Sequence, residues 1–227
     1  VETYKIVCDN VPFGALRYGW GADANFHIGD INITPEQFSF ELLVNQNQSL
    51  KVEFSKPGRH NIENTVAAIA LAHQVLPFEK IIPHIKSFQG VRRRFDMIIQ
   101  SEPLIFIDDY GHHPTAIEAV YYTLCAFYPN RKKTLLFQPH LYSRTADFMN
   151  EFSQALSLFD AIYLLPIYAA REEPLDDVSS ELLVQKINKP SRVISKTEVL
   201  DVLPTQELDL LITMGAGDIS ELVEPLK

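Results

Sequence analysis

Three short polar segments each follow an apolar run of the sequence, and each carries side chains that could bind or activate a ligand. They are DDYGHHP after LIFI, QPHLYSR after TLLF, and MGAGD after LDLLIT. In a parallel sheet covered by helices, ligands bind where the strands end at their carboxyl edge. The pattern therefore predicts a binding site to which all three segments contribute.

The first segment combines carboxylates with imidazoles. Asp108 and Asp109 offer acceptors for ribose hydroxyls or for a metal, and His112 and His113 can donate, accept or bind metal near neutral pH. Pro114 suits the first turn of a helix and places His113 at the helix cap. The competing interpretation is that these residues only end a strand and cap a helix.

The other two segments suit anionic groups. His140, Tyr142 and Arg144 alternate along the chain, so in an extended segment they would point to one side. Arginine can hold a carboxylate through two hydrogen bonds. Gly215 and Gly217 could admit an anion at the start of a helix, although a purely structural tight turn is the favoured interpretation.

Upstream, GRHNIEN places Asn61 and Asn64 three residues apart, on one face of a helix start. Their amides could form paired donor and acceptor hydrogen bonds with the edge of an adenine base, while Asn61 alone could instead be a helix cap. The run Arg92–Arg94 is interpreted either as a solvated basic surface or as a phosphate clamp.

Composition narrows the class of protein. The 227 residues are 46% hydrophobic and carry a formal net charge of −9, which argues against a general nucleic-acid binder. No apolar run approaches the ~20 residues of a membrane span. Cys8 and Cys125 form no CxxC pair, so a reducing cytoplasm is expected. Both also lie away from the polar segments, which disfavours a zinc site of His112, His113 and His140.

The order of elements predicts two α/β parts, residues 1–97 and 98–227. In the first, short alternating runs predict strands and two apolar periodic runs predict helices: strands Tyr4–Cys8, Ala15–Trp20, Phe26–Ile33, Phe38–Val44 and Leu50–Phe54, and helices Asn61–Leu76 and Phe78–Phe88. In the second, strands and helices alternate, as in a mostly parallel sheet with covering helices. The expected strands are Leu104–Asp108, Thr134–Gln138, Ala161–Leu165, Arg192–Ile194 and Leu208–Thr213; the helices are Thr115–Tyr128, Thr145–Phe159, Ser180–Ile187 and Thr197–Leu203, with one more after Gly217.

Taken in order, GRHNIEN, GVRRRFD, IDDYGHHP, FQPHLYSRT and MGAGDI resemble the Mur ligases, over essentially the whole chain and most firmly from Gly58 onward. The resemblance implies a C-terminal Rossmann-like domain, with a mostly parallel sheet and helices on both faces, preceded by the α/β tail of a P-loop-type central ATPase domain. No GxxxxGK[ST] occurs in the sequence, so the P-loop is expected before Val1.

The resemblance further implies an ATP-dependent, amide-forming ligase that adds L-alanine to UDP-N-acetylmuramate through an acyl phosphate, in cytoplasmic peptidoglycan precursor synthesis. The implied cofactors are ATP and Mg²⁺, the latter bound mainly by residues upstream. The chain alone is expected to be inactive. A monomer or weak homodimer without nucleic-acid or membrane partners is expected.

By motif position, the resemblance also assigns site residues. The ATP site is expected at His60, Asn61, Asn64, Arg94 and Asp109, and the L-alanine site at Tyr110, His112, His140 and Arg144; His112, Arg144 and Arg94 are expected to be catalytic. Leu141 departs from the family pattern, in which many members carry Arg after the His.

Two alternatives remain at this stage. The chain could be a stand-alone module that binds a nucleotide or an amino acid. It could also belong to another ligase of this type, such as the muramyl-tripeptide recycling ligase or a folate or cyanophycin ligase. The segment QPHLYSRT argues against the recycling ligase, and Arg144 and His112 argue against the folate and cyanophycin types.

Overall fold

The computed structural model describes residues 15–33, 38–54 and 58–227. The chain divides into two compact units between Gly90 and Val91. The expected strand Tyr4–Cys8 lies outside the described residues. The division falls earlier than the expected one between residues 97 and 98, because strand β5 (Asp96–Gln100) pairs with β6 (Ile105–Asp109) and so belongs to the second unit. In the described part of the chain, no helix is long and apolar enough to cross a membrane.

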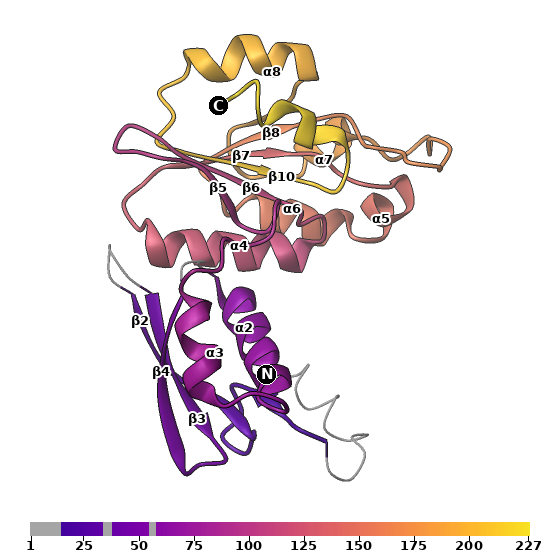
Figure 1. Ribbon diagram of the computed structural model, residues 1–227. Coiled ribbons are helices and arrows are strands. Elements are labelled where there is room, and N and C mark those ends of the chain that lie inside the picture. Colours follow the sequence, from indigo (N-terminus) through magenta and orange to yellow (C-terminus); the bar gives the residue numbers. More distant parts are fainter. Residues whose placement is uncertain (1–14, 34–37, 55–57) are drawn as a thin grey trace. The chain divides into compact units, whose positions relative to one another are not determined.

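The first unit is a four-stranded sheet, in the order β1-β2-β3-β4, packed against two helices (Figure 1). Only β1–β2 is parallel. The core forms because alternate residues of β3, such as Phe40 and Leu42, face Val66 and Ile69 of α2. The expected strand Ala15–Trp20 is reduced to β1. The elements are β1 (Tyr18–Gly19), β2 (Phe26–Ile33), β3 (Phe38–Val44), β4 (Gln48–Phe54), α2 (Arg59–Ala72) and α3 (Phe78–Ile85).

The second unit is a six-stranded sheet in the order β5-β6-β10-β7-β8-β9, in which only β5 is antiparallel to its neighbour. This confirms the predicted mostly parallel sheet. The remaining strands are β7 (Lys133–Phe137), β8 (Ala161–Leu164), β9 (Ser191–Val193) and β10 (Leu210–Met214).

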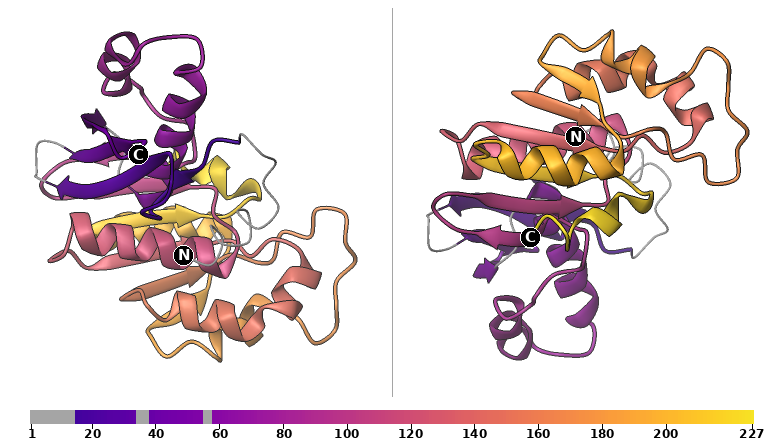
Figure 2. Two further views of the ribbon diagram at one scale, coloured as in Figure 1. Left: turned by 90° about the horizontal axis from the view of Figure 1, so that it is seen from below. Right: turned by 90° about the horizontal axis from the view of Figure 1, so that it is seen from above.

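Helices cover both faces of this sheet, as expected (Figures 1 and 2). Ile105 and Ile107 of β6 join the core under α4, α6 and α7, whereas Phe106 between them joins the core under α8, η1 and η2. Every residue of β6, β7 and β10 is buried, which explains their near-continuous apolar sequences. The elements are α4 (Pro114–Phe127), α6 (Met149–Leu156), α7 (Ser180–Val184), α8 (Lys196–Val202), and the 3₁₀ helices η1 (Leu203–Thr205) and η2 (Asp218–Leu222).

Two expectations for the second unit were wrong. The single helix Thr145–Phe159 is instead α5 (Tyr142–Asp147) followed by α6, because the backbone leaves the helical conformation at Phe148 (φ −117°, ψ 24°). The helix expected after Gly217 is the five-residue η2. Strand β5 was not expected at all, since its short sequence DMIIQ has no alternating pattern.

Candidate functional site

The three polar segments leave the sheet side by side. Strand β10 lies between β6 and β7, and Met214 is in register with both Asp109 and Phe137. Backbone pairing continues one step beyond the strands: Gln138 N donates to Met214 O (3.0 Å) and Gly215 N donates to Asp109 O (3.2 Å). The parallel sheet therefore fixes the starting points of all three loops at one edge.

Two imidazoles and an arginine converge above this edge. The ring centroids of His112 and His140 are 5.7 Å apart, and Arg144 Nη1 lies 3.5 Å from His140 Nδ1. The ring of Tyr110 meets His112 edge to face at 5.3 Å. The structure thus brings together the four residues assigned to the L-alanine site.

The sequence suggested that His140, Tyr142 and Arg144 would point to one side of an extended segment, and this explanation was wrong. The segment after His140 is not extended, because Leu141 (φ 73°) turns the chain into α5 at Tyr142. Arg144 reaches His140 because the two are four residues apart across the start of a helix, where such pairs are neighbours.

Burial keeps both imidazoles neutral. It is the largest cause that lowers the pKa of His112, aided by the charges of Arg144 and Arg94 and opposed by a hydrogen bond to Tyr110 O. Burial also lowers the pKa of His140, with His112 and Arg144 adding to it and Glu172 opposing it. His112 Nδ1 donates to Tyr110 O (3.0 Å), which leaves Nε2 of the neutral ring as the acceptor. A neutral imidazole with a free lone pair can act as a base near pH 7.

His113 takes no part in this cluster. It caps α4, where its Nδ1 accepts from Thr115 N, and its ring packs edge to face on Phe148 at 4.7 Å. Pro114 occupies the first turn of α4, as expected. Over residues 15–33, 38–54 and 58–227, no three His, Cys, Asp or Glu side chains gather to hold a metal.

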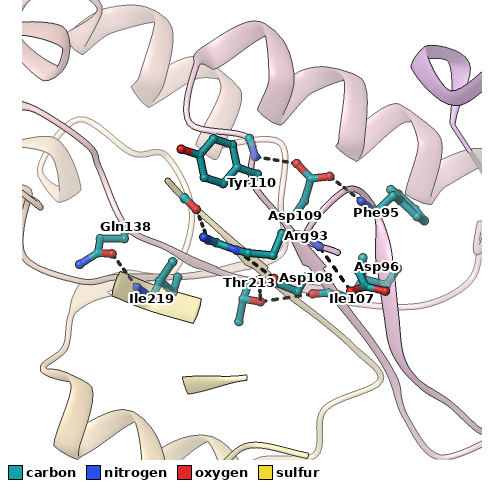
Figure 3. Close-up of polar contacts among 12 residues, drawn as sticks. Arg93, Phe95, Asp96, Ile107, Asp108, Asp109, Tyr110, Gln138, Thr213 and Ile219 are labelled. Atoms are coloured by element: carbon teal, nitrogen blue, oxygen red, sulfur yellow. Dashed lines mark hydrogen bonds and ion pairs between the residues drawn. The ribbon is translucent and has the colours of Figure 1, made fainter. Parts of the chain in front are cut away.

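The paired aspartates make hydrogen bonds to the segments around them (Figure 3). Asp109 is 4% exposed; its Oδ1 accepts from Gly111 N (2.6 Å) and its Oδ2 from Phe95 N (2.7 Å). Burial raises the pKa of Asp108, while hydrogen bonds from Thr213 (2.6 Å) and the Arg93 charge oppose that rise. Asp109 therefore has a structural role that the sequence did not reveal, whatever it contributes to ribose binding.

The arginine run divides into different environments. Arg92 and Arg94 are exposed, whereas the side chain of Arg93 is 22% exposed and pairs with Asp108 (Nε–Oδ2, 3.3 Å). The guanidinium carbon of Arg94 lies 5.5 Å from the ring centroid of Tyr110. Arg94 is thus placed beside the cluster, while Arg93 is engaged within the protein. Sequence reasoning did not separate these roles.

A further loop, between β8 and α7, was missed because it carries no motif. Tyr168 N donates to Pro139 O and Leu141 N donates to Tyr168 O, both at 2.9 Å. The Glu172 carboxylate accepts from Ser143 N (3.0 Å) and from Ser143 Oγ (2.5 Å). We call residues 166–173 the strap, since these contacts bind it along the segment that carries His140 and Arg144.

The MGAGD turn is glycine-rich for packing reasons. A Cβ at Gly215, whose φ is +150°, would lie 2.8 Å from Gln138 O, and one at Gly217 would lie 2.7 Å from Tyr168 Cγ. Gln138 holds the turn, with Nε2 donating to Asp218 Oδ1 (2.8 Å) and Oε1 accepting from Ile219 N (2.9 Å). These contacts favour the structural interpretation of the turn.

The residues assigned to adenine lie in the first unit. His60, Asn61 and Asn64 occupy the first turns of α2, which begins at Arg59. The N-cap is Gly58, with φ 114° and no side-chain cap, so Asn61 is not the helix cap. Asn61 and Asn64 share one face of the helix start, as the sequence predicted.

A mostly parallel sheet with helices on both faces, and a histidine–arginine cluster at its carboxyl edge, define a Rossmann-like domain with a polar site. Family models identify it further: residues 93–217 match the Mur ligase glutamate ligase domain, and residues 4–72 match the Mur ligase middle domain. The chain belongs to the Mur ligase family.

Individual relatives agree. The chain is 38% identical over 223 residues to a UDP-N-acetylmuramate–L-alanine ligase of Flavobacterium psychrophilum, covering 97% of this chain and 50% of the relative. It is 40% identical over 207 residues to the protein of the same name in Porphyromonas gingivalis, covering 90% and 45%. The chain thus spans about half the length of the curated relatives it matches.

Solved structures share the fold. The UDP-N-acetylmuramate–alanine ligase of Thermotoga maritima superposes with a TM-score of 0.78 at 22% identity, over 93% of this chain and 46% of that one. The MurF ligase of Thermotoga maritima, in complex with ADP, gives 0.69 at 16% identity, over 97% and 50%.

Proposed function

We propose that this chain supplies the amino-acid site and part of the ATP site of a ligase that joins L-alanine to UDP-N-acetylmuramate. The observation that carries the proposal is the convergence of His112, His140 and Arg144 at the carboxyl edge of the sheet. The names of the relatives, which match over most of this chain, support the choice of L-alanine. The product would enter peptidoglycan precursor synthesis in the cytoplasm, and so serve cell shape and division.

In the proposed reaction, Arg144 holds the carboxylate of L-alanine through its guanidinium fork. His112 Nε2, neutral because burial lowers its pKa, takes a proton from the alanine ammonium. The freed amine attacks the carbonyl of the acyl phosphate, an amide bond forms, and phosphate leaves from the tetrahedral intermediate. His140 stacks on Tyr168 and lies 3.5 Å from Arg144. In this position it would hold the Arg144 guanidinium at a fixed place relative to the His112 imidazole.

The nucleotide is assigned by motif. Asn61 and Asn64, with His60, would contact adenine, Asp109 the ribose, and Arg94 the phosphates. Mg²⁺ would supply charge neutralisation at the phosphates. The roles proposed here for the residues of this chain are positioning and proton transfer.

A full-length protein that contains this chain provides the test. Phosphate release is measured with ATP, UDP-N-acetylmuramate and each of L-alanine, glycine, L-serine and the recycled tripeptide. We expect the highest kcat/KM with L-alanine, and no turnover by the 227-residue chain alone. A preference for the tripeptide would contradict the proposal and favour the recycling ligase, and ligand binding without any turnover would favour a stand-alone binding module.

A further inference from the structure

The partly buried side chain of Arg93 contacts Asp108, Gly215 and Tyr110 (Figure 3). Its Nε donates to Asp108 Oδ2 (3.3 Å) near the end of β6, and its Nη2 donates to Gly215 O directly after β10. Its guanidinium carbon lies 5.0 Å from the ring centroid of Tyr110. Asp108 is 2% exposed, so this ion pair is formed largely out of water. One side chain thus bridges the ends of two adjacent strands and contacts the aromatic ring beside them.

The backbone around Arg93 is clamped to the same loop. Tyr110 N donates to Arg93 O (2.7 Å), and Phe95 N donates to Asp109 Oδ2 (2.7 Å). Arg93 has a φ of 60°, a left-handed conformation that is uncommon for a residue with a side chain. Such a conformation persists where the surrounding contacts fix it. Here those contacts hold both the backbone and the guanidinium of Arg93 against the β6 loop.

Tyr110 lies between Arg93 and the two side chains proposed to act in the reaction, His112 and Arg94. Its ring meets His112 edge to face at 5.3 Å and lies under the guanidinium of Arg94 at 5.5 Å. Its carbonyl accepts from His112 Nδ1, which sets the tautomer of that imidazole. A shift of Tyr110 would therefore move both the proposed base and the proposed phosphate-binding arginine.

We propose that Arg93 is a positioning residue, which fixes Tyr110 against the ends of β6 and β10 and through that ring places His112 and Arg94 for the reaction. The functional half of this inference rests on the proposed ligase activity; the structural half does not. Arg93 is poorly suited to bind phosphate itself, because Nε and Nη2 already donate within the protein. Arg94 is exposed and is the better candidate for that contact.

The first experiment needs no catalysis. In the 227-residue chain, the ring protons of His112 are observed by NMR in the wild type, R93M and R93K. Because aromatic ring currents depend on geometry, R93M should shift the His112 signals. R93K should shift them less, since lysine keeps a cation near Asp108 but lacks the planar fork that spans Asp108 and Gly215. If R93M does not fold, R93K supplies the same comparison.

A matched control is the pair Arg131–Asp209 (Nη1–Oδ1, 2.8 Å), an ion pair at the opposite ends of β7 and β10. R131M removes an arginine–aspartate contact from the same unit, yet should leave the His112 signals in place. Unchanged His112 signals in both R93M and R93K would overturn the inference, whether or not the protein proves to be a ligase.

The second experiment uses the full-length protein and saturating ATP. A displaced catalytic group commonly costs about 100-fold in rate, so R93M should lower kcat by about 10- to 100-fold, R93K by less, and R131M not at all. A rise confined to the KM for ATP, with unchanged kcat, would make Arg93 a direct nucleotide ligand and contradict the positioning role. Absence of activity in the wild type would refute the proposed ligase function, and the NMR result would then decide the structural claim alone.

Discussion

His140 and Tyr168 form a parallel bridge between two loops, and their rings stack with centroids 5.6 Å apart and planes inclined by 23°. The bridge extends the pairing of β7 with β8 beyond the strands themselves. Since Glu172 of the same strap also accepts from the backbone and hydroxyl of Ser143, the segment that carries His140 and Arg144 is held along its length. The placement of His140 and Arg144 therefore depends on the strap, whose Glu172 also acts on the pKa of His140 through its charge.

Gly217→Ala tests whether the strap holds the segment that carries His140 and Arg144. The added methyl group would press against Gln138 Oε1 and lie 2.7 Å from Tyr168 Cγ, so Gln138, Tyr168 or the MGAGD turn must move. We expect a loss of about 1–3 kcal/mol in the free energy of unfolding, measured by urea denaturation of the chain, and a lower kcat/KM for L-alanine in the full-length protein.

Gly29→Ala is the control for this substitution. Its Cβ would meet the carboxylate end of Glu41 at 3.2 Å, in the first unit. A flexible side chain can give way there, so the cost should be smaller. Equal stability and kinetics of Gly217→Ala and wild type would show that the turn tolerates a side chain and that Tyr168 is not held against it.

The sequence could predict the strand ends because buried parallel strands and polar termini have strong local signals. LIFI, TLLF and LLIT are dominated by apolar residues, and polar or glycine-rich segments follow them within one or two residues. It could not predict the strap, because Tyr168 and Glu172 act through backbone pairing and a tertiary contact with Ser143. Neither contact has a periodicity or spacing that a single sequence displays.

Arg144→Lys should weaken L-alanine binding. Lysine keeps the charge but presents no planar fork to a carboxylate, and hydrogen bonds to charged groups contribute about 1.5–3 kcal/mol. The KM for L-alanine should therefore rise by about 10- to 100-fold in initial-rate measurements, with little change in the KM for ATP. Arg192→Lys is the control, since Arg192 lies on the edge strand β9 and contacts the Tyr163 ring. Unchanged alanine kinetics in Arg144→Lys would remove Arg144 from the site.

The pH dependence of the reaction should follow the imidazoles. Burial lowers the pKa of His112 and of His140 below the ordinary 6.5. Both are thus neutral at pH 7, and kcat/KM for L-alanine should fall only as the pH drops through these lowered values. Their contribution to stability has the same sign: it is fully present above pH 6.5 and is lost as the pH falls through the folded-state pKa.

NMR titration of the two imidazoles checks this directly, and the rate profile of His112→Gln checks the assignment. Glutamine can keep a hydrogen bond to Tyr110 O but cannot accept a proton. The variant should lose most of kcat together with the acidic limb that belongs to His112. A titration of His112 above pH 6.5 would contradict its lowered pKa, and an unchanged acidic limb in His112→Gln would contradict its role as the base.

The arginine run shows a different reason for incomplete prediction. Arg93 and Arg94 are adjacent and chemically identical, so composition cannot tell which is exposed. The difference arises from the left-handed backbone at Arg93, which directs its guanidinium toward Asp108 and Gly215. The guanidinium contacts that go with this conformation are 15 residues along the chain at Asp108 and 122 residues along it at Gly215.

Asp109→Ala separates a structural role from a ligand-binding one. The substitution removes the acceptors of Gly111 N and Phe95 N, both in buried surroundings. Leaving a buried donor unsatisfied costs about 1–3 kcal/mol, so the 227-residue chain should lose at least that much free energy of unfolding in urea, with no nucleotide present. Asp209→Ala is the control, because Asp209 accepts from Lys132 N (2.9 Å) and pairs with Arg131 (2.8 Å), but its side chain is 40% exposed, so water can replace it there. If Asp109→Ala unfolds like the wild type while the KM for ATP rises in the full-length protein, the carboxylate serves the ribose rather than the loop; a loss of stability with an unchanged KM would assign it to the loop alone.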